Sequence, residues 1–107
     1  SIDEGKIRAE GTRRELVALV GWKDRVELTA GGTTVGPATT ALRALEGVEE
    51  ATASDGRIVL VVEEARHLLP RILETAAAAG ATIRSVEVVE PDLEAVFLHL
   101  TGKALRD

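Results

Sequence analysis

A β-hairpin is predicted by the stretch VEEATASDGRIVLVVE, residues 48–63. Its centre, Asp55-Gly56, has turn composition, because these residues tolerate the left-handed backbone of a two-residue hairpin turn. The five aliphatic residues from Ile58 to Val62 predict a central strand covered on at least one face. The Glu- and Thr-rich residues 48–53 predict an edge strand.

A strand and a helix are predicted before the hairpin. Apolar and polar residues alternate from Arg25 to Ala30, as in a half-buried strand. Pro37 suits a first helical position and Gly47 suits the end of that helix. Between them, apolar residues recur at helical spacing: Ala38, Ala41, Leu42 and Leu45.

A second helix and a last strand are predicted after the hairpin. The helix spans about residues 67–79, with Pro70 in its first turn and Gly80 at its end. The strand covers residues 81–90, and its alternation slips near Ser85, which predicts a β-bulge. The order strand, helix, strand, strand, helix, strand is that of a ferredoxin-like βαββαβ fold, an α+β class with an antiparallel sheet.

Further elements are predicted at both ends. Residues 1–11 read as a short hairpin, followed by an N-terminal helix that ends at Gly21. Thr12 and Glu15 have the spacing of a capping box at its start. Its apolar face is expected to contain Leu16, Leu19 and Val20. An extra C-terminal helix is expected to start at the N-cap Asp92 and to stop at Gly102.

Composition excludes several classes of function. The chain of 107 residues fits one domain, and its net charge of −5 opposes nucleic-acid binding. Its only aromatic residues, Trp22 and Phe97, offer no platform for base stacking. The longest aliphatic run is far below the ~20 residues of a membrane-spanning helix. The absence of cysteine excludes disulfides, a thiol nucleophile and metal transfer through a CxxC loop.

One glycine-rich loop resembles a phosphate-binding loop only in part. Gly31 and Gly36 have the first spacing of a P-loop. Pro37 and Ala38 then stand where a P-loop needs Lys and Ser or Thr. A flexible connection from strand to helix is the favoured interpretation.

The histidines and carboxylates show no catalytic pattern either. His67 and His99 lack a second ligand at helical spacing, so both are expected at the surface. The pairs Glu49-Glu50 and Glu63-Glu64 are adjacent in sequence, so in strands their side chains point to opposite faces. They are expected to be solvated charges and not an acid–base dyad.

Both ends of the chain resemble one protein family. Residues 2–16, IDEGKIRAEGTRREL, are similar to the segment that closes the nucleotide-binding domain of ABC transporter ATPases. Residues 90–102, EPDLEAVFLHLTG, resemble the C-terminal ending of ATP-binding subunits of drug, polysaccharide and sodium exporters, of the daunorubicin-resistance type. Asp92 stands where that ending usually has Ser, and keeps its N-capping ability; Ala95 stands where it usually has Asp.

The resemblance implies that the chain is a piece of a bacterial exporter subunit. Residues 1–22 would be the tail of the nucleotide-binding domain, and residues 23–107 a C-terminal accessory domain. The sites for ATP and Mg²⁺ would lie before residue 1, so no catalytic, cofactor-binding or metal-binding residue, and no enzymatic activity, is expected in this chain. The parent would hydrolyse ATP in the cytoplasm, held at the inner face of the membrane by a permease subunit, with a second ATPase subunit as partner.

The implied role of the accessory domain is contact between subunits or regulation of ATP-driven transport. The expected packing or interface helix carries an apolar face formed by Leu93, Val96, Phe97 and Leu100. Packing within the domain is favoured over an interface, and a homodimer also fits. The alternative is a ferredoxin-like small-molecule-sensing module, whose ligand would bind at the loop Gly31–Gly36.

Overall fold

The hairpin forms as predicted. β2 (Val48–Ser54) pairs antiparallel with β3 (Arg57–Val62). Asp55 and Gly56 between them have φ angles of 51° and 76°, the left-handed values of a type I′ hairpin turn. The computed structural model of the chain describes residues 13–31 and 35–106.

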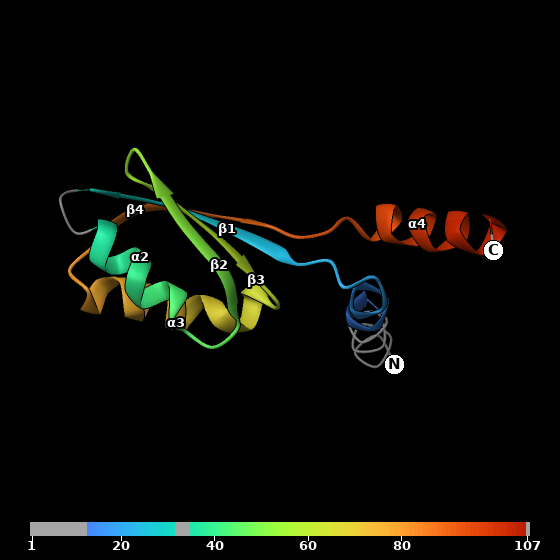
Figure 1. Cartoon of the computed structure of the whole chain (residues 1–107), viewed down its shortest axis with the longest axis horizontal. Helices are drawn as coiled ribbons and strands as arrows, with labels where there is room; N and C mark the ends of the chain where they lie inside the picture. The colour runs from blue at the N-terminus through green and yellow to red at the C-terminus, as the bar shows by residue number, and fades with distance from the viewer. Residues whose placement is uncertain (1–12, 32–34, 107) are drawn as a thin grey trace, which may run out of the picture. The chain divides into compact units, whose positions relative to one another are not determined.

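A four-stranded antiparallel sheet is completed by β1 (Asp24–Gly31) and β4 (Thr82–Val89), in the order β2-β3-β1-β4. β2 is therefore an edge strand and β3 is central, as predicted. α2 (Val35–Arg43) connects β1 to β2, and α3 (Ala65–Ala78) connects β3 to β4. Figure 1 shows both helices on the same face of the sheet. This arrangement confirms the ferredoxin-like α+β fold.

The core lies between that face and the two helices. Alternate residues of β1 and β3 point into it, because side chains of a strand alternate between the two faces. Its fully buried large side chains come from both layers: Val26, Leu28, Leu42, Ile58, Leu60, Val62 and Ile72. With no aromatic residue among them, the core is filled by aliphatic side chains alone.

The predicted bulge is present in β4. The register against β1 shifts between Thr29, which pairs with Ser85, and Ala30, which pairs with Ile83. Arg84 is the bulged residue, because no residue of β1 pairs with it. The hydroxyls of the neighbouring pair Thr29 and Ser85 are 2.5 Å apart across the strands. The slip in the sequence pattern is therefore a real feature of the strand.

α3 begins at Ala65, so the predicted start near residue 67 is wrong, and Pro70 is not in the first turn. The earlier start is fixed from outside the helix, because the Asp24 carboxylate accepts a hydrogen bond of 2.8 Å from the Ala65 amide. Pro70 lies inside α3 as its sixth residue, and because proline has no backbone N–H it cannot donate to the Arg66 carbonyl.

α2 ends at Arg43 and not at Gly47. The Leu45 amide donates to the Leu42 carbonyl at 3.1 Å, which closes the chain into a tighter turn after the helix. Gly47, with a φ of 95°, belongs to the turn that leads into β2. Leu45 still packs against the core, although it lies outside the helix.

Of the four predicted glycine ends, those at Gly21 and Gly80 are confirmed, and Gly102 joins Gly47 as wrong. Gly21 (φ 69°) follows the helix of residues 13–20, and Gly80 (φ 89°) follows α3. At Gly80 the amides of Gly80 and Ala81 donate to Ala77 and Ala76, the Schellman pattern. Gly102 does not end its helix, because α4 (Leu93–Arg106) runs through it. Its φ is not left-handed, so the helix continues.

The predicted face of the helix of residues 13–20 is confirmed at Leu16 and Val20 and wrong at Leu19. Its half-buried residues are Arg13, Leu16, Val17 and Val20, while Leu19 is 73% exposed. The positions 13, 16, 17 and 20 have helical spacing, and Leu19 lies outside them. The predicted hairpin of residues 1–11 and the capping residue Thr12 lie outside the described residues.

The chain divides into two compact units. One is Lys23–Glu90, which contains the whole sheet with α2 and α3. The other joins the residues before Lys23 with those from Pro91 onward, including α4. In the part of the chain that the structure describes, no helix is long and apolar enough to cross a bilayer.

Candidate functional site

The predicted interface or packing helix, α4, divides its four named residues between two environments. Val96 is fully buried and Leu100 is half-buried. Leu93 is 40% exposed and Phe97 is 60% exposed. Packing within the domain therefore accounts for Val96 and not for Phe97.

Leu98, which the sequence reasoning left out of the face, is 61% exposed beside Phe97. Leu93, Phe97 and Leu98 are the exposed large apolar residues of α4, and we refer to them as the α4 patch. Leu93 and Phe97 are one helical turn apart, and Leu98 follows Phe97 about 100° further around the helix. The signal that could have revealed it is Leu98 itself, a large apolar residue that lies outside the stripe of Leu93, Val96, Phe97 and Leu100. Such a patch is the kind of surface that binds another apolar surface.

The start of α4 is fixed by its N-cap, as predicted. Asp92 accepts a hydrogen bond from the Glu94 amide at 3.2 Å through its side chain. Its carbonyl accepts from the Val96 amide at 3.0 Å, the first bond within the helix. The first turn of α4, which carries Leu93 of the α4 patch, is therefore stabilised by the Asp92 carboxylate.

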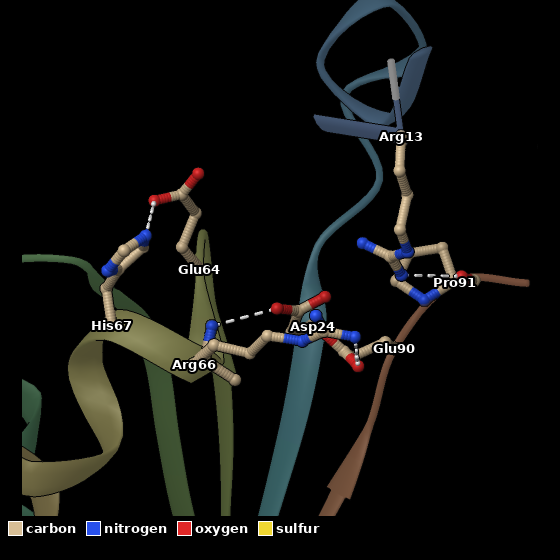
Figure 2. A network of polar contacts seen from close by, with 8 residues as sticks. Arg13, Asp24, Glu64, Arg66, His67, Glu90 and Pro91 are labelled. Atoms are coloured by element: carbon tan, nitrogen blue, oxygen red, sulfur yellow. Dashed lines mark hydrogen bonds and ion pairs between the residues drawn. The ribbon is translucent and has the colours of Figure 1, made fainter. Parts of the chain in front are cut away.

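α4 is also tied to the residues that precede Lys23, within the same compact unit. Arg13 donates to the Pro91 carbonyl at 3.0 Å, as Figure 2 shows. The rings of Trp22 and His99 are 5.4 Å apart and tilted by 53°. These contacts join segments that are far apart in the sequence, and they place His99 against an aromatic ring.

His67 lies at the surface of the other unit, as predicted. Its ring nitrogen Nε2 is 3.7 Å from a carboxylate oxygen of Glu64, one helical turn away. Among the described residues, no group of three or more His, Cys, Asp or Glu side chains could hold a metal ion.

The two adjacent glutamate pairs lie at the surface, and one glutamate of each pair approaches the same lysine. Glu49 and Glu63 each approach the Lys23 ammonium, at 3.4 and 3.7 Å. Glu50 and Glu64 are exposed. Solvated ion pairs of this kind contribute little to stability, and their geometry is not that of an acid–base dyad.

The loop Gly31–Gly36 lies only in part within the described residues, since residues 32–34 are outside them. A Cβ at Gly31 would lie 2.5 Å from the Arg84 guanidinium, the flexible end of a side chain that can shift away. Pro37 is the third residue of α2 and not the first.

A polar network at the start of α3 was missed by the sequence reasoning (Figure 2). Asp24, only 6% exposed, binds the Ala65 amide. The next residue, Arg66, makes a two-pronged contact with Glu90, at 2.8 and 2.9 Å. The first turn of α3 therefore binds Asp24, the first residue of β1, and Glu90, the residue after β4.

A ferredoxin-like sheet followed by a helix with an exposed apolar patch defines the chain as a small α+β module. The family model described as "ATP-binding protein DrrA1-3-like, C-terminal domain" matches residues 11–101. The chain belongs to this family, which confirms the resemblance seen at its two ends.

Two curated relatives carry related sequences. The linearmycin resistance ATP-binding protein LnrL of Bacillus subtilis (strain 168) is 32% identical over 108 residues, which cover 99% of this chain and 34% of LnrL. The daunorubicin resistance ATP-binding protein DrrA3 of Streptomyces coeruleorubidus is 34% identical over 102 residues, which cover 94% of this chain and 31% of DrrA3. The chain spans about a third of the length of these relatives.

Among solved structures, the yeast copper transporter domain Ccc2a, studied in apo and Cu(I)-loaded states, has a TM-score of 0.49 and 20% identity. The similarity covers 64% of this chain and 99% of that domain.

Proposed function

We propose that this chain is a non-catalytic contact domain of an ABC exporter's ATP-binding protein, in which the α4 patch binds a partner subunit. The observation that carries the proposal is the exposure of Leu93, Phe97 and Leu98 on a helix whose Val96 is fully buried. Exposed apolar clusters of this kind mark interaction surfaces.

Membership of the family supports this assignment. The curated relatives are named as ATP-binding proteins for drug resistance, and the similarity covers about a third of each. In this proposal the ATP and Mg²⁺ of the parent protein bind outside the chain, residues 1–22 belong to the tail of the nucleotide-binding domain, and the contact modulates ATP-driven transport. The partners are a permease subunit and a second ATP-binding subunit at the cytoplasmic face of the membrane.

The test uses a full-length ATP-binding protein that carries this chain, produced together with its permease. Phe97→Ser removes the largest side chain of the α4 patch, and Leu19→Ser is the matched control, since Leu19 is equally apolar and 73% exposed on the other helix of the same unit. We expect Phe97→Ser to reduce co-purification of the partner subunit at least about tenfold, because aromatic anchors dominate interface energies. Leu19→Ser should assemble normally.

Normal assembly of a folded Phe97→Ser protein would contradict the proposal. Circular dichroism of both variants establishes that they are folded. Loss of assembly in both variants alike would also contradict it, because the effect would then not belong to the α4 patch.

A further inference from the structure

The two edges of the sheet differ in how they meet solvent. At the β2 edge, Arg43 reaches over from α2 and donates to the Ala51 carbonyl at 2.7 Å. That bond occupies an outward-facing backbone group, which is a known way to block pairing with another strand. At the β4 edge, by contrast, apolar side chains are exposed: Val86 by 39% and Val88 by 37%.

The register shows which backbone groups of β4 face outward. The Ala30 amide donates to the Gly56 carbonyl at 2.8 Å, so the backbone groups of Ala30, and of every second residue before it, point toward β3. Those of Thr29, Glu27 and Arg25 then point toward β4, where they pair with Ser85, Glu87 and Val89. The backbone groups of Val86 and Val88 consequently point away from the sheet.

The side chains of Val86 and Val88 lie on the helix-covered face. They stand opposite Leu28 and Val26, whose side chains are fully buried beneath the helices. Opposite residues in antiparallel strands point to the same face. The β4 edge thus combines outward backbone donors and acceptors with a strip of apolar surface that α3 leaves uncovered.

The open face of the same strand carries complementary charges. Glu87 lies on that face, because it stands opposite Glu27, which contacts Arg25 and Arg57 there. Arg84 also lies on it, since its guanidinium sits where a Cβ on Gly31 would project. Arg84 and Glu87, which lie on either side of Val86 in the sequence, therefore both project from the open face of the sheet, whereas the Val86 side chain lies on the helix-covered face.

We propose that β4 pairs with β4 of a second copy of this chain, antiparallel and with the two-fold axis at Val86. In this register Val86 faces Val86 of the second copy, and each Glu87 faces Ser85 and lies beside Arg84 of the other copy. A register centred on Glu87 would instead oppose two carboxylates directly, which is unfavourable. The resulting interface is isologous and joins two four-stranded sheets into one. It does not depend on the α4 patch.

Sedimentation velocity of the chain between about 1 μM and 1 mM measures this association. Val86→Pro removes an outward amide that no strand among the described residues uses, so we expect the sheet to tolerate it and the dimer to be lost. Ala53→Pro is the matched control, because the Ala53 amide points outward from the opposite edge, and it should dimerise normally.

Charge reversal tests the register without relying on proline. Arg84→Glu and Glu87→Arg should each weaken the dimer about tenfold, because each creates two repulsive pairs, and the double variant should restore it. Since the chain has no cysteine, Val86→Cys adds a clean probe. Directly opposed residues of this kind have Cα atoms about 5.5 Å apart, within disulfide range, so oxidation should yield a covalent dimer.

A chain that stays monomeric up to about 1 mM would overturn the proposal. So would a dimer that tolerates Val86→Pro and both charge reversals. A dimer that instead disappears with Phe97→Ser would place self-association on the α4 patch, which overturns the β4 pairing and leaves the proposed contact function standing.

Discussion

Asp24 shows what a single residue contributes to this fold. It lies on the same side of β1 as Val26 and Leu28, so its carboxylate points toward the core side of the sheet. The alternation of the strand places an acidic residue at an inward position, and this is the signal that sequence reasoning could have used. Its partner, the Ala65 amide, is 41 residues away and could not have been read from local pattern.

Replacement of Asp24 by alanine should lower the free energy of unfolding by about 1–3 kcal/mol, because the buried Ala65 amide would lose its acceptor. Urea denaturation followed by circular dichroism measures the change. Glu74→Ala, at an exposed site on the same helix, is the control and should stay within about 0.5 kcal/mol of the parent chain. Equal stability of the two variants would show that Asp24 does not cap α3.

Val96 and Phe97 are neighbours with opposite expected roles. Val96→Ala should lower the free energy of unfolding by about 1.5–3 kcal/mol, because a fully buried side chain is lost and a cavity remains. Phe97→Ala should lower it by no more than about 1 kcal/mol, since most of that ring is already in water. Thermal and urea unfolding of the two variants provide the comparison, and a larger effect for Phe97 would contradict the exposure of the α4 patch.

The helices and strands themselves were largely predictable. Alternation predicted β1 and β4, a continuous aliphatic run predicted β3, and the bulge near Ser85 followed from a break in the alternation of β4. The turn at Asp55-Gly56 and the stops at Gly21 and Gly80 followed from residues that accept left-handed backbone. These features could be predicted because each depends on residues that are close together in the sequence.

The errors concern where helices begin and end and which of their faces are buried. α3 starts early because Asp24 reaches it from β1, and α2 stops early because a tighter turn replaces its last residues. The two faces of α4 could not be assigned from spacing, because Val96 and Phe97 both belong to the predicted stripe. Only tertiary packing distinguishes them.

Gly102 provides a test at the level of the helix. A Cβ on Gly102 would meet no atom within 4 Å, and the residue lies inside α4. Gly102→Ala should therefore stabilise the chain by about 0.5–1 kcal/mol and increase its helical circular dichroism. The control Gly80→Ala should destabilise it by about 1–2 kcal/mol, because the φ of Gly80 is 89°. Destabilisation by Gly102→Ala would mean that α4 ends at this glycine after all.

At the scale of the whole molecule, the ferredoxin-like unit Lys23–Glu90 is distinct from the unit that contains α4. The proposed domain limit at residues 22 and 23 follows the resemblance to ABC ATPases, while α4 shares a unit with residues before that limit through Arg13 and Trp22.

Binding of Mg-ATP tests most directly whether this chain acts through contact and not through nucleotide chemistry. Isothermal titration should show no binding to the 107-residue chain up to about 1 mM nucleotide. A full-length ATP-binding protein that carries the chain should bind Mg-ATP with the same affinity with or without Phe97→Ser. Micromolar binding by the chain alone, or a weakened affinity in the full-length variant, would contradict the account.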